Sequence, residues 1–238
     1  MPNSIIDVFN EYFEMVPAIS VELKKEVYKL RYQVYCVENG FLDSAHYQEA
    51  MESDEFDKHS CHYLIYHRKR NVYMATTRLI LPDKNNLNKL FPIEIHSQID
   101  NVDALSNISR HSLAEASRFC ISKEFRRRKD EFPMTSSEEN TFTLDERRIL
   151  PHITLALFAC LIKISHDYGI KDWYAVMEPS LIRFFTMLGI NFTEIGPLTD
   201  YHGKRKPCTI KVENLLEGVA EKDIRKWNML TNKGNFWS

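Results

Sequence analysis

Residues 173–192, which read WYAVMEPSLIRFFTMLGINF, decide the fold class. The run Trp173–Met177 is apolar and typical of a buried strand. Pro179 suits the first turn of a helix, and Gly189 ends that helix, after which a second strand is expected over 190–195. A strand, a helix and a strand in close succession predict a sheet with helices packed on it.

The sequence on both sides extends this pattern. An apolar helix is expected from Pro151 to about Tyr168, and two period-2 runs upstream predict a β-hairpin. The expected helices are 5–16, 20–34, 151–168, 179–189 and 218–230, and the expected strands are 62–67, 72–81, 113–122, 173–177, 190–195 and 208–213.

This order predicts one domain over residues 1–238 with a mixed α/β (α+β) architecture, in which helices flank a central mixed sheet. The sequence shows no internal repeat and no low-complexity linker between two halves. Residues 82–112 have no regular period and are expected to be irregular. Residues 129–148 are polar, acidic and without period, so we expect a flexible insertion there.

Composition excludes several classes of function. The formal net charge is -2, so no overall field favours nucleic acid or a membrane surface, and either role would need a local patch. We expect no nucleic-acid partner. No two of the 7 glycines lie within three positions of each other, which excludes the P-loop and the Rossmann fingerprint. The 9 histidines form no HExxH pattern and the 5 cysteines form no CxxC pair, so no metal site is expected.

The cysteines and the first residues favour a cytoplasmic location. The cysteines lie mostly in apolar surroundings, as expected of reduced, buried thiols. The first residues are acidic where a signal peptide needs basic ones. The longest apolar stretch, Ile153–Ile162, has about half the roughly 20 residues of a membrane span.

Charged residues stand out in the N-terminal half. Arg31 lies on the same helix face as Val27, Leu30 and Val34, which is unusual for a charged side chain. Two readings remain open for it: a functional arginine, or one that extends from the edge of the core to solvent.

These residues resemble a motif of the acyl-homoserine lactone synthases, a branch of the GNAT acyltransferases. That branch carries an arginine and two aromatic residues at fixed spacing, then an Asp-x-x-Asp pair, an arginine on a hairpin and a Glu-x-x-Arg on the next strand. The matching residues here are Arg31, Tyr35, Phe41, Asp54, Asp57, Arg78, Glu115 and Arg118. The likeness covers about residues 25–122, and the broader GNAT resemblance continues to about 213.

A closer resemblance is to two related groups, the N-acyl amino acid synthases and the acyltransferases associated with PEP-CTERM/exosortase systems. Tyr35 and Phe41 stand where lactone synthases usually have phenylalanine and tryptophan. The segments shared with these groups are Leu30–Cys36, Glu115–Phe119 with the basic 125–128, Met177–Pro179 and Tyr201–Pro207.

The resemblance implies a GNAT-like fold and transfer of a long-chain fatty acyl group from acyl carrier protein to the amine of an amino acid or similar small molecule. Glu115 would accept the amine proton, or else serve as a structural partner of an arginine. Asp54 and Asp57 would hold the amine or fix Arg31 in place. Arg78 and Arg118 would complete a linked cluster of charges.

The donor would be the acyl-phosphopantetheine arm of the carrier, with no resident cofactor. Residues 125–130 lack the glycine with which acetyltransferases wrap the pyrophosphate of coenzyme A. Phe119, Arg126, Arg127 and Arg128 are the expected donor-binding residues, since a basic run suits an acidic carrier. A second basic run, 204–206, is a further candidate, and for both runs a simple solvated surface is the alternative.

Two other functions stay open at this point. One is a lactone synthase proper, with S-adenosylmethionine as the amine. The other is a non-catalytic module that binds the loaded carrier.

Overall fold

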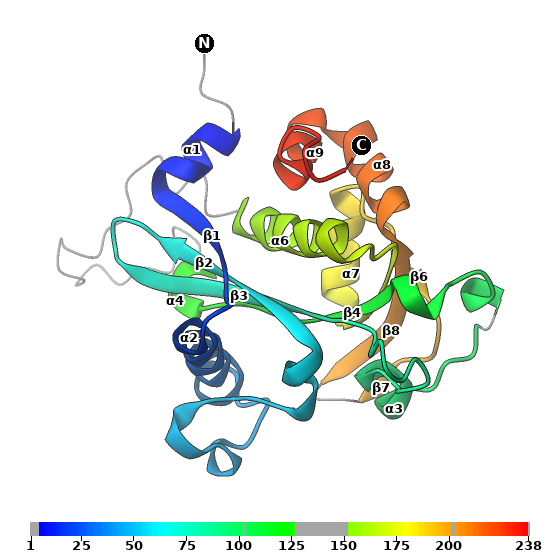
Figure 1. The fold of residues 1–238 in the computed structure, drawn as a ribbon, viewed down its shortest axis with the longest axis horizontal. Coiled ribbons are helices and arrows are strands. Elements are labelled where there is room, and N and C mark those ends of the chain that lie inside the picture. Colours follow the sequence, from blue (N-terminus) through cyan, green and yellow to red (C-terminus); the bar gives the residue numbers. More distant parts are fainter. Residues whose placement is uncertain (1–4, 102, 127–151, 201–202, 238) are drawn as a thin grey trace.

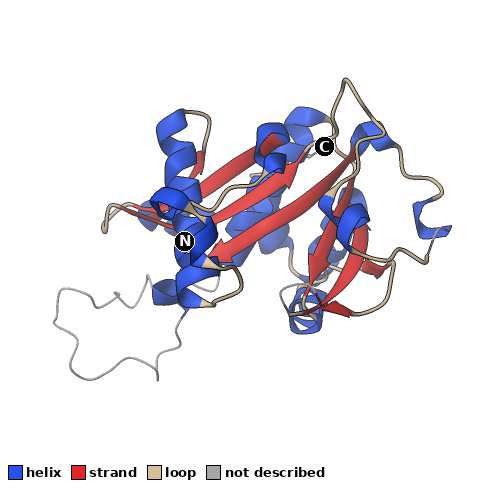
Figure 2. Ribbon diagram, turned by 90° about the horizontal axis from the view of Figure 1, so that it is seen from below, coloured by secondary structure: helices blue, strands red, loops and turns tan. Residues whose placement is uncertain are grey.

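A mixed sheet organises the computed structural model, which describes residues 5–101, 103–126, 152–200 and 203–237 (Figure 1; Figure 2). Its strand order is β1-β2-β3-β4-β5-β8-β6, with the short β7 paired to β8. Every pairing is antiparallel except that of β4 with β5. The strands are β1 Phe13–Pro17, β2 Ser60–His67, β3 Val72–Ile80, β4 Leu113–Ile121, β5 Asp172–Met177, β6 Thr193–Glu194, β7 Thr199–Asp200 and β8 Lys204–Lys211.

Helices cover both faces of this sheet. The buried α6 lies on one face together with α7, α8 and α9, whereas α2 and α3 lie on the other (Figure 1). The helices are α1 Ile5–Tyr12, α2 Val21–Tyr32, α3 Pro92–His96, α4 Lys123–Arg126, α6 Ile153–Tyr168, α7 Pro179–Met187, α8 Val212–Lys222 and α9 Ile224–Thr231. The expected mixed α/β fold with a central mixed sheet is confirmed.

Alternation along the strands divides the core into separate layers. Ile65 of β2 joins the large cluster around α6, while its neighbour Leu64 joins a smaller one with Val27 and Leu30 of α2. A third cluster, with Ile80 and Leu113, lies under α3. The face that carries α2 and α3 therefore has two apolar clusters.

The expected helix over 5–16 is wrong beyond Tyr12. The helix ends at Tyr12, and Phe13–Pro17 forms the edge strand β1, paired with β2 from Phe13↔His67 to Pro17↔Tyr63. Phe13 is buried while Glu14 is exposed, as alternation requires. Tertiary pairing with β2 has outweighed a local pattern that fits a helix.

Other boundaries also differ from expectation. The C-terminal helix over 218–230 is two helices that meet at Asp223, whose side chain caps α9. The strand over 208–213 begins at Lys204 and contains the second basic run, and only Thr193–Glu194 of the strand over 190–195 is paired. The irregular stretch 82–112 contains the short helix α3.

A β-bulge and a strand divergence shape the middle of the sheet. Arg78 pairs with Ser117 and Thr76 with Cys120, so Arg118 and Phe119 together face one residue of β3. Arg118 has a φ of 50°, the left-handed conformation that a non-glycine residue adopts only under constraint. On the other side, β4 pairs with β5 only from Leu113↔Asp172 to Ala116↔Ala175. The two parallel strands therefore part at the bulge.

The single domain over 1–238 stays a prediction. The expected insertion at 129–148 lies outside the described residues, as do Arg127 and Arg128.

Candidate active site

Arg31 anchors a cluster of charges between the two apolar clusters on the α2 face. It is fully buried, so the reading in which it reaches solvent from the edge of the core is wrong. Its Nε donates to Glu52 Oε2 at 2.5 Å and its Nη1 to Asp57 Oδ1 at 2.7 Å. A guanidinium this deep must be paired, because an isolated buried charge is very costly.

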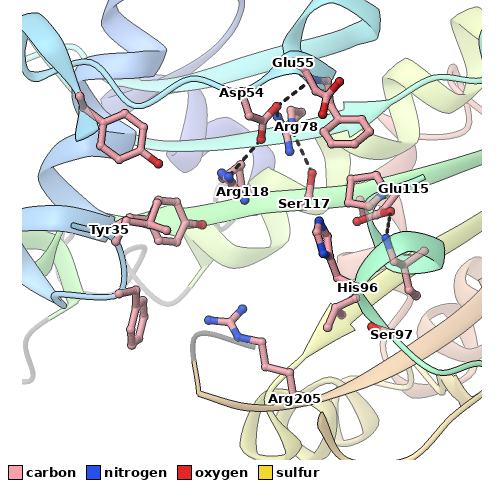
Figure 3. A pocket seen from close by; sticks show the side chains of 18 residues that line it. Tyr35, Asp54, Glu55, Arg78, His96, Ser97, Glu115, Ser117, Arg118 and Arg205 are labelled. Carbon is pink, nitrogen blue, oxygen red and sulfur yellow. Dashed lines mark hydrogen bonds and ion pairs between the residues drawn. The ribbon is translucent and has the colours of Figure 1, made fainter. Parts of the chain in front are cut away.

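Two further arginines join the same carboxylates from the sheet. Arg78 Nη1 donates to Asp54 Oδ1 at 2.6 Å and to Asp57 Oδ1 at 2.7 Å. Arg118 Nη2 donates to Glu52 Oε1 at 3.0 Å and to Asp54 Oδ2 at 3.1 Å. Figure 3 shows Asp54 between these two side chains. The predicted charged residues of this cluster therefore do come together, as a linked network.

Sheet register and local turns explain this convergence. His62 lies opposite Arg78 and Arg78 opposite Ser117, which places one row of side chains across three strands on one face. Asp54 and Asp57 belong to a capping box at the turn 55–59: Asp54 N donates to Asp57 Oδ2 at 2.7 Å, and the Asp54 side chain accepts from Phe56 N.

Opposing charges keep the acids ionised. Burial acts to raise the pKa of Glu52, but Arg31 and Arg118 outweigh it and lower the pKa to about 2. Burial likewise opposes ionisation of Asp57, yet Arg31 and Arg78 hold the pKa of that carboxyl well below its usual range. Burial and the positive charge of Arg31 lower the pKa of His62 to about 3, so His62 is neutral at pH 7.

Glu52 is the residue that sequence reasoning missed. It is fully buried and binds two arginines, whereas the resemblance singled out only the Asp-x-x-Asp pair that follows. Its acidic neighbours in Glu52-Ser-Asp54 were the available signal. That signal was weak, because an acid in a polar loop is ordinarily solvated.

Glu115 stands apart from this network. Its carboxylate accepts a hydrogen bond from Ile93 N at 2.9 Å, and among the described residues it forms no ion pair with an arginine. Burial raises the pKa of Glu115 to about 7, against the opposing effects of that hydrogen bond and of Arg78. The alternative role as a partner of Arg118 receives no support, and a carboxyl of this pKa can exchange a proton near neutral pH.

A pocket of about 390 Å³ joins Glu115 to the cluster (Figure 3). It opens where β4 and β5 part, and Ala116, Ser117, Arg118 and Val176 lie on its wall. Crevices at the carboxyl ends of parallel strands are the usual ligand sites of such sheets. Arg31 and Asp57 do not line the pocket and lie behind it, so they support it from inside the core.

Aromatic residues and one more arginine also line the pocket. Tyr35, in a π-helical turn over Gln33–Glu38, has Arg118 Cζ at 5.5 Å from its ring centroid. Burial raises the pKa of Tyr35 above its usual range, so it is a neutral phenol. Arg205 Cζ lies 5.6 Å from the centroid of Phe41, and both residues line the pocket.

The residues expected to bind the donor are less well placed. Phe119 packs beneath the sheet against Phe158 and Phe185 and does not line the pocket. Arg126 ends α4, and Arg127 and Arg128 lie outside the described residues. In the second basic run, Lys206 pairs with Glu194 and Arg205 with Glu178, so nearby acids offset its charge.

The described part of the chain offers neither a membrane span nor a metal site. Within it, no helix has the length and apolar character needed to cross a membrane. No group of three or more histidine, cysteine or acidic side chains there could hold a metal ion.

Comparison with protein families gives one match. Residues 30–132 match the family described as acetyltransferase (GNAT) domain. This segment contains every residue of the charged cluster and also Glu115. No curated protein matches the chain in sequence.

Several solved structures of similar fold are acyl-homoserine lactone synthases or N-acyl amino acid synthases. FeeM, an N-acyl amino acid synthase from uncultured soil microbes, is 13% identical with a TM-score of 0.56, over 89% of this chain and 97% of that one. The acyl-homoserine lactone synthase LasI is 16% identical with a TM-score of 0.57, over 87% and 95%.

A third similar structure is BjaI, a coenzyme A-dependent acyl-homoserine lactone synthase solved with S-adenosylmethionine and isopentyl-coenzyme A. It is 16% identical with a TM-score of 0.58, over 89% of this chain and 88% of that one. At these identities the likeness concerns the fold, and the family match lies over the half that holds the charged cluster. Residues 30–132 thus match a GNAT acetyltransferase domain, and the fold of the chain is that of the acyl-homoserine lactone synthases and the N-acyl amino acid synthase.

Proposed function

We propose that this protein transfers a long-chain fatty acyl group, in the cytoplasm, from acyl carrier protein to the amine of an amino acid or similar small molecule. The observation that carries the proposal is Glu115, a buried carboxyl with a pKa of about 7 on the wall of the pocket. Amide formation from a thioester needs a neutral amine and an acceptor for its proton, and such a carboxylate meets the second need at physiological pH.

The reaction requires no covalent enzyme intermediate. The neutral amine nitrogen attacks the thioester carbonyl carbon, and the amine proton passes to the Glu115 carboxylate, directly or through one water. The tetrahedral intermediate then collapses, the C–S bond breaks, and the thiolate leaves and takes up a proton. Holding the two reactants in line supplies much of the rate, since thioesters are reactive.

The gap between β4 and β5 is a suitable place for an extended donor arm. Beyond Ala116↔Ala175 the facing edges of the two strands no longer pair with each other, which leaves backbone groups available to a phosphopantetheine chain. The bulge at Arg118 and Phe119 interrupts the other edge of β4 at the same level. A thioester in this gap lies beside Glu115.

The choice of donor rests on the sequence. The stretch 125–130 has no glycine for the pyrophosphate of coenzyme A, and its basic residues suit an acidic carrier. BjaI, by contrast, is described as coenzyme A-dependent. The experiment must therefore include both donors.

The deciding measurement is thiol release from palmitoyl-loaded acyl carrier protein and from palmitoyl-coenzyme A. Each donor is assayed with and without a pool of amino acids, and the products are identified by mass spectrometry. We expect amine-dependent release from the carrier and an N-acyl product. A ring-closed product formed from S-adenosylmethionine would establish a lactone synthase instead, and binding of the loaded carrier without any release would establish a non-catalytic module.

A further inference from the structure

The short helix α3 brings a backbone donor to Glu115. Ile93 N donates to Glu115 Oε2 at 2.9 Å, and Figure 3 shows this bond at the wall of the pocket. Glu115 lies on β4, whereas Ile93 belongs to a helix of five residues between irregular segments. A helix this short has little stability of its own, so other contacts must hold its N–H groups in place.

An ion pair between Glu94 and Arg110 fastens α3. Glu94 Oε2 accepts from Phe91 N at 2.8 Å, which closes the first turn, and from Arg110 Nη2 at 2.7 Å, while Arg110 Nη1 donates to the other carboxylate oxygen. Arg110 Nε also donates to the carbonyl oxygen of Leu87 at 3.0 Å, and Nη2 donates to that of Lys89. One guanidinium thus joins a carboxylate and two loop carbonyls, which requires the fork of donors that arginine has.

Arg110 connects α3 to the strands on either side of Glu115. It lies in a turn over Arg110–Ser112, directly before β4. Its Cζ is 4.5 Å from the ring centroid of Phe91, and the Phe91 ring meets that of Tyr174 edge-on with centroids 6.1 Å apart. Tyr174 lies on β5, opposite Glu115 in the parallel register. Arg110 therefore fixes α3 relative to both strands at the level of Glu115.

The bond from α3 is the main interaction that favours the charged form of Glu115. Burial raises the pKa of Glu115 most, and the Ile93 N–H opposes this rise more than either Arg78 or Arg118 does. The charged and titratable side chains that interact with Glu115 or line its pocket from the neighbouring elements are Arg78 of β3, Arg118 of β4, Tyr174 of β5, Glu94 and His96 of α3, and Asp54 and Glu55 before β2. Loss of the N–H would favour the protonated acid.

We infer that Arg110 is a positioning residue for Glu115: by fastening α3, it holds the Ile93 N–H on the carboxylate and keeps that carboxylate ready to accept a proton. This inference rests on the proposed function, in which Glu115 takes up the proton of the amine. Arg110 does not line the pocket, so its effect on the reaction passes through Glu115. Release of α3 should raise the pH at which Glu115 loses its proton.

The first measurement follows the Glu115 carboxyl directly. The chemical shifts of the glutamate carboxyl carbons are titrated by NMR in wild type and in Arg110→Gln, and the Glu115 signal is identified by its absence in Glu115→Gln. We expect the midpoint of Glu115 to rise by about 0.5–1 pH unit in Arg110→Gln, the scale for loss of one hydrogen bond to a charged group. An unchanged midpoint would overturn the inference, whatever the enzymatic activity.

The pH dependence of acyl transfer is the second measurement. Wild type and Arg110→Gln are compared at each pH, so the ionisation of the amine cancels. The variant should lower kcat/KM by about 2- to 6-fold at pH 7 and leave it near the wild-type value at pH 9, where the carboxylate is formed in both proteins. An equal loss at both pH values would show a purely structural role and contradict the inference.

Two further variants separate position from charge. Arg110→Lys keeps the positive charge but cannot bind Glu94 and two carbonyls at once, so the midpoint of Glu115 should again rise, by a smaller amount. A wild-type midpoint in this variant would reduce Arg110 to its charge and overturn the positioning role. Arg225→Gln is the matched control: Arg225 forms a two-bond pair with Asp223 away from the pocket lining, so the midpoint should not move.

The outcomes separate this inference from the proposed function. A midpoint raised by Arg110→Gln, in a protein that acylates no amine, would overturn the proposed function while Arg110 still positions Glu115. Acyl transfer by the wild type, with a midpoint that Arg110→Gln does not move, would leave the proposed function standing and remove Arg110 from it.

Discussion

Glu115 and Glu52 are two buried glutamates with opposite protonation behaviour. Glu52 faces two guanidiniums and has a pKa of about 2. Among the described residues, Glu115 has a backbone N–H as its one hydrogen-bond partner, and its pKa is about 7. The same residue type thus gives a permanent anion at one position and a titrating carboxyl at the other, because the neighbours differ. This contrast is consistent with a supporting role for Glu52 and with the proton transfer that we propose for Glu115.

Replacement of Glu115 by glutamine should separate chemistry from folding. We expect Glu115→Gln to slow acyl transfer by at least about 100-fold, the usual scale for a general base. In the wild type, kcat/KM should rise as the pH passes through about 7, where Glu115 loses its proton. Steady-state rates between pH 5.5 and 8.5 test both points. An unchanged rate in the folded variant would remove Glu115 from this role.

The same variant should gain stability at alkaline pH. The folded-state pKa of Glu115 is raised from 4.5 to about 7, so the folded protein binds more protons than the unfolded chain in between, and stability falls as the pH rises through that window. Glutamine lacks this titration and should raise the free energy of unfolding at pH 8 by about 1–3 kcal/mol. Urea unfolding at pH 5 and pH 8 provides the measurement, and a greater gain at pH 5 than at pH 8 would contradict it.

Replacement of Glu52 should have the opposite effect. Glu52→Gln leaves Arg31 and Arg118 without a shared carboxylate and should cost about 3–5 kcal/mol of stability at pH 7. Because the pKa of Glu52 is lowered from 4.5 to about 2, its stabilisation is complete above pH 4.5 and is lost as the pH falls toward 2. Between pH 4.5 and 2, the free energy of unfolding should therefore fall less in the variant than in the wild type.

An exposed glutamate on α2 provides the control for this measurement. Glu26 pairs with Lys29 at 2.8 Å on the solvent side of the helix that carries Arg31. Glu26→Gln should change the free energy of unfolding by no more than about 1 kcal/mol. Equal losses of unfolding free energy in the two variants would show that the buried cluster stabilises the fold no more than an exposed ion pair does. Because Arg31 belongs to this buried cluster, an inactive Arg31 variant could be inactive through loss of stability and would not by itself show catalysis.

At the scale of elements, local sequence pattern determines some helices and strands, whereas others depend on pairing with distant strands. The sequence predicted the hairpin, β4, β5, α6 and α7, because each has its own period, a proline start or a glycine end. Phe13–Pro17 could not be recognised as a strand, since its pairing partner lies some fifty residues away in β2. The alternation of buried and exposed residues in Phe13–Pro17 identifies a strand only once the pairing with β2 is known.

The site residues likewise divide into those that the sequence predicted and those that distant elements place. The resemblance placed Arg31, Asp54 and Arg78 in one cluster, and the structure brings them together. Glu52 was not singled out as a site residue, and Arg205 was named only within the basic run 204–206. Each owes its place to distant elements: Glu52 to two arginines, Arg205 to the end of β5. No spacing within one segment reports such a position.

Two glycines fix how α7 and α8 pack. A Cβ on Gly218 would lie 2.2 Å from the carbonyl oxygen of Gly189, far inside van der Waals contact. Gly218→Ala should therefore lower the free energy of unfolding by about 1–3 kcal/mol, the cost of overpacking, although alanine is the better helix former. Thermal or urea unfolding measures this loss. A stabilised variant would show that the two helices can move apart freely.

Gly169→Ala distinguishes crowding from backbone strain. Gly169 ends α6 with a φ of 68°, but nothing lies within 4 Å of an added Cβ. This variant should cost about 1 kcal/mol from the left-handed conformation alone. A smaller loss at Gly218 than at Gly169 would contradict the close contact between α7 and α8.

At the scale of the whole molecule, the proposed recognition of an acidic carrier by a near-neutral chain requires a local basic patch. The net charge of -2 gives no general attraction, so the position of basic residues decides. In the run 204–206, Arg205 and Lys206 each face an acid, which lessens their pull on a distant partner. The run that begins at Arg126, where α4 follows β4, is then the better docking candidate.

Charge reversal across Arg126–Arg128 should therefore raise KM for palmitoyl-loaded acyl carrier protein by about 10-fold or more, since reversed charges at a rim weaken encounter with an acidic partner. The same variant should leave KM for a short palmitoyl-pantetheine thioester nearly unchanged, because that donor reaches the pocket without the carrier. Lys204→Glu, in the offset run, is the matched control and should change neither value much. The effect should also shrink as salt screens the charges. Equal loss with both donors would mean that the run shapes the pocket instead of docking the carrier.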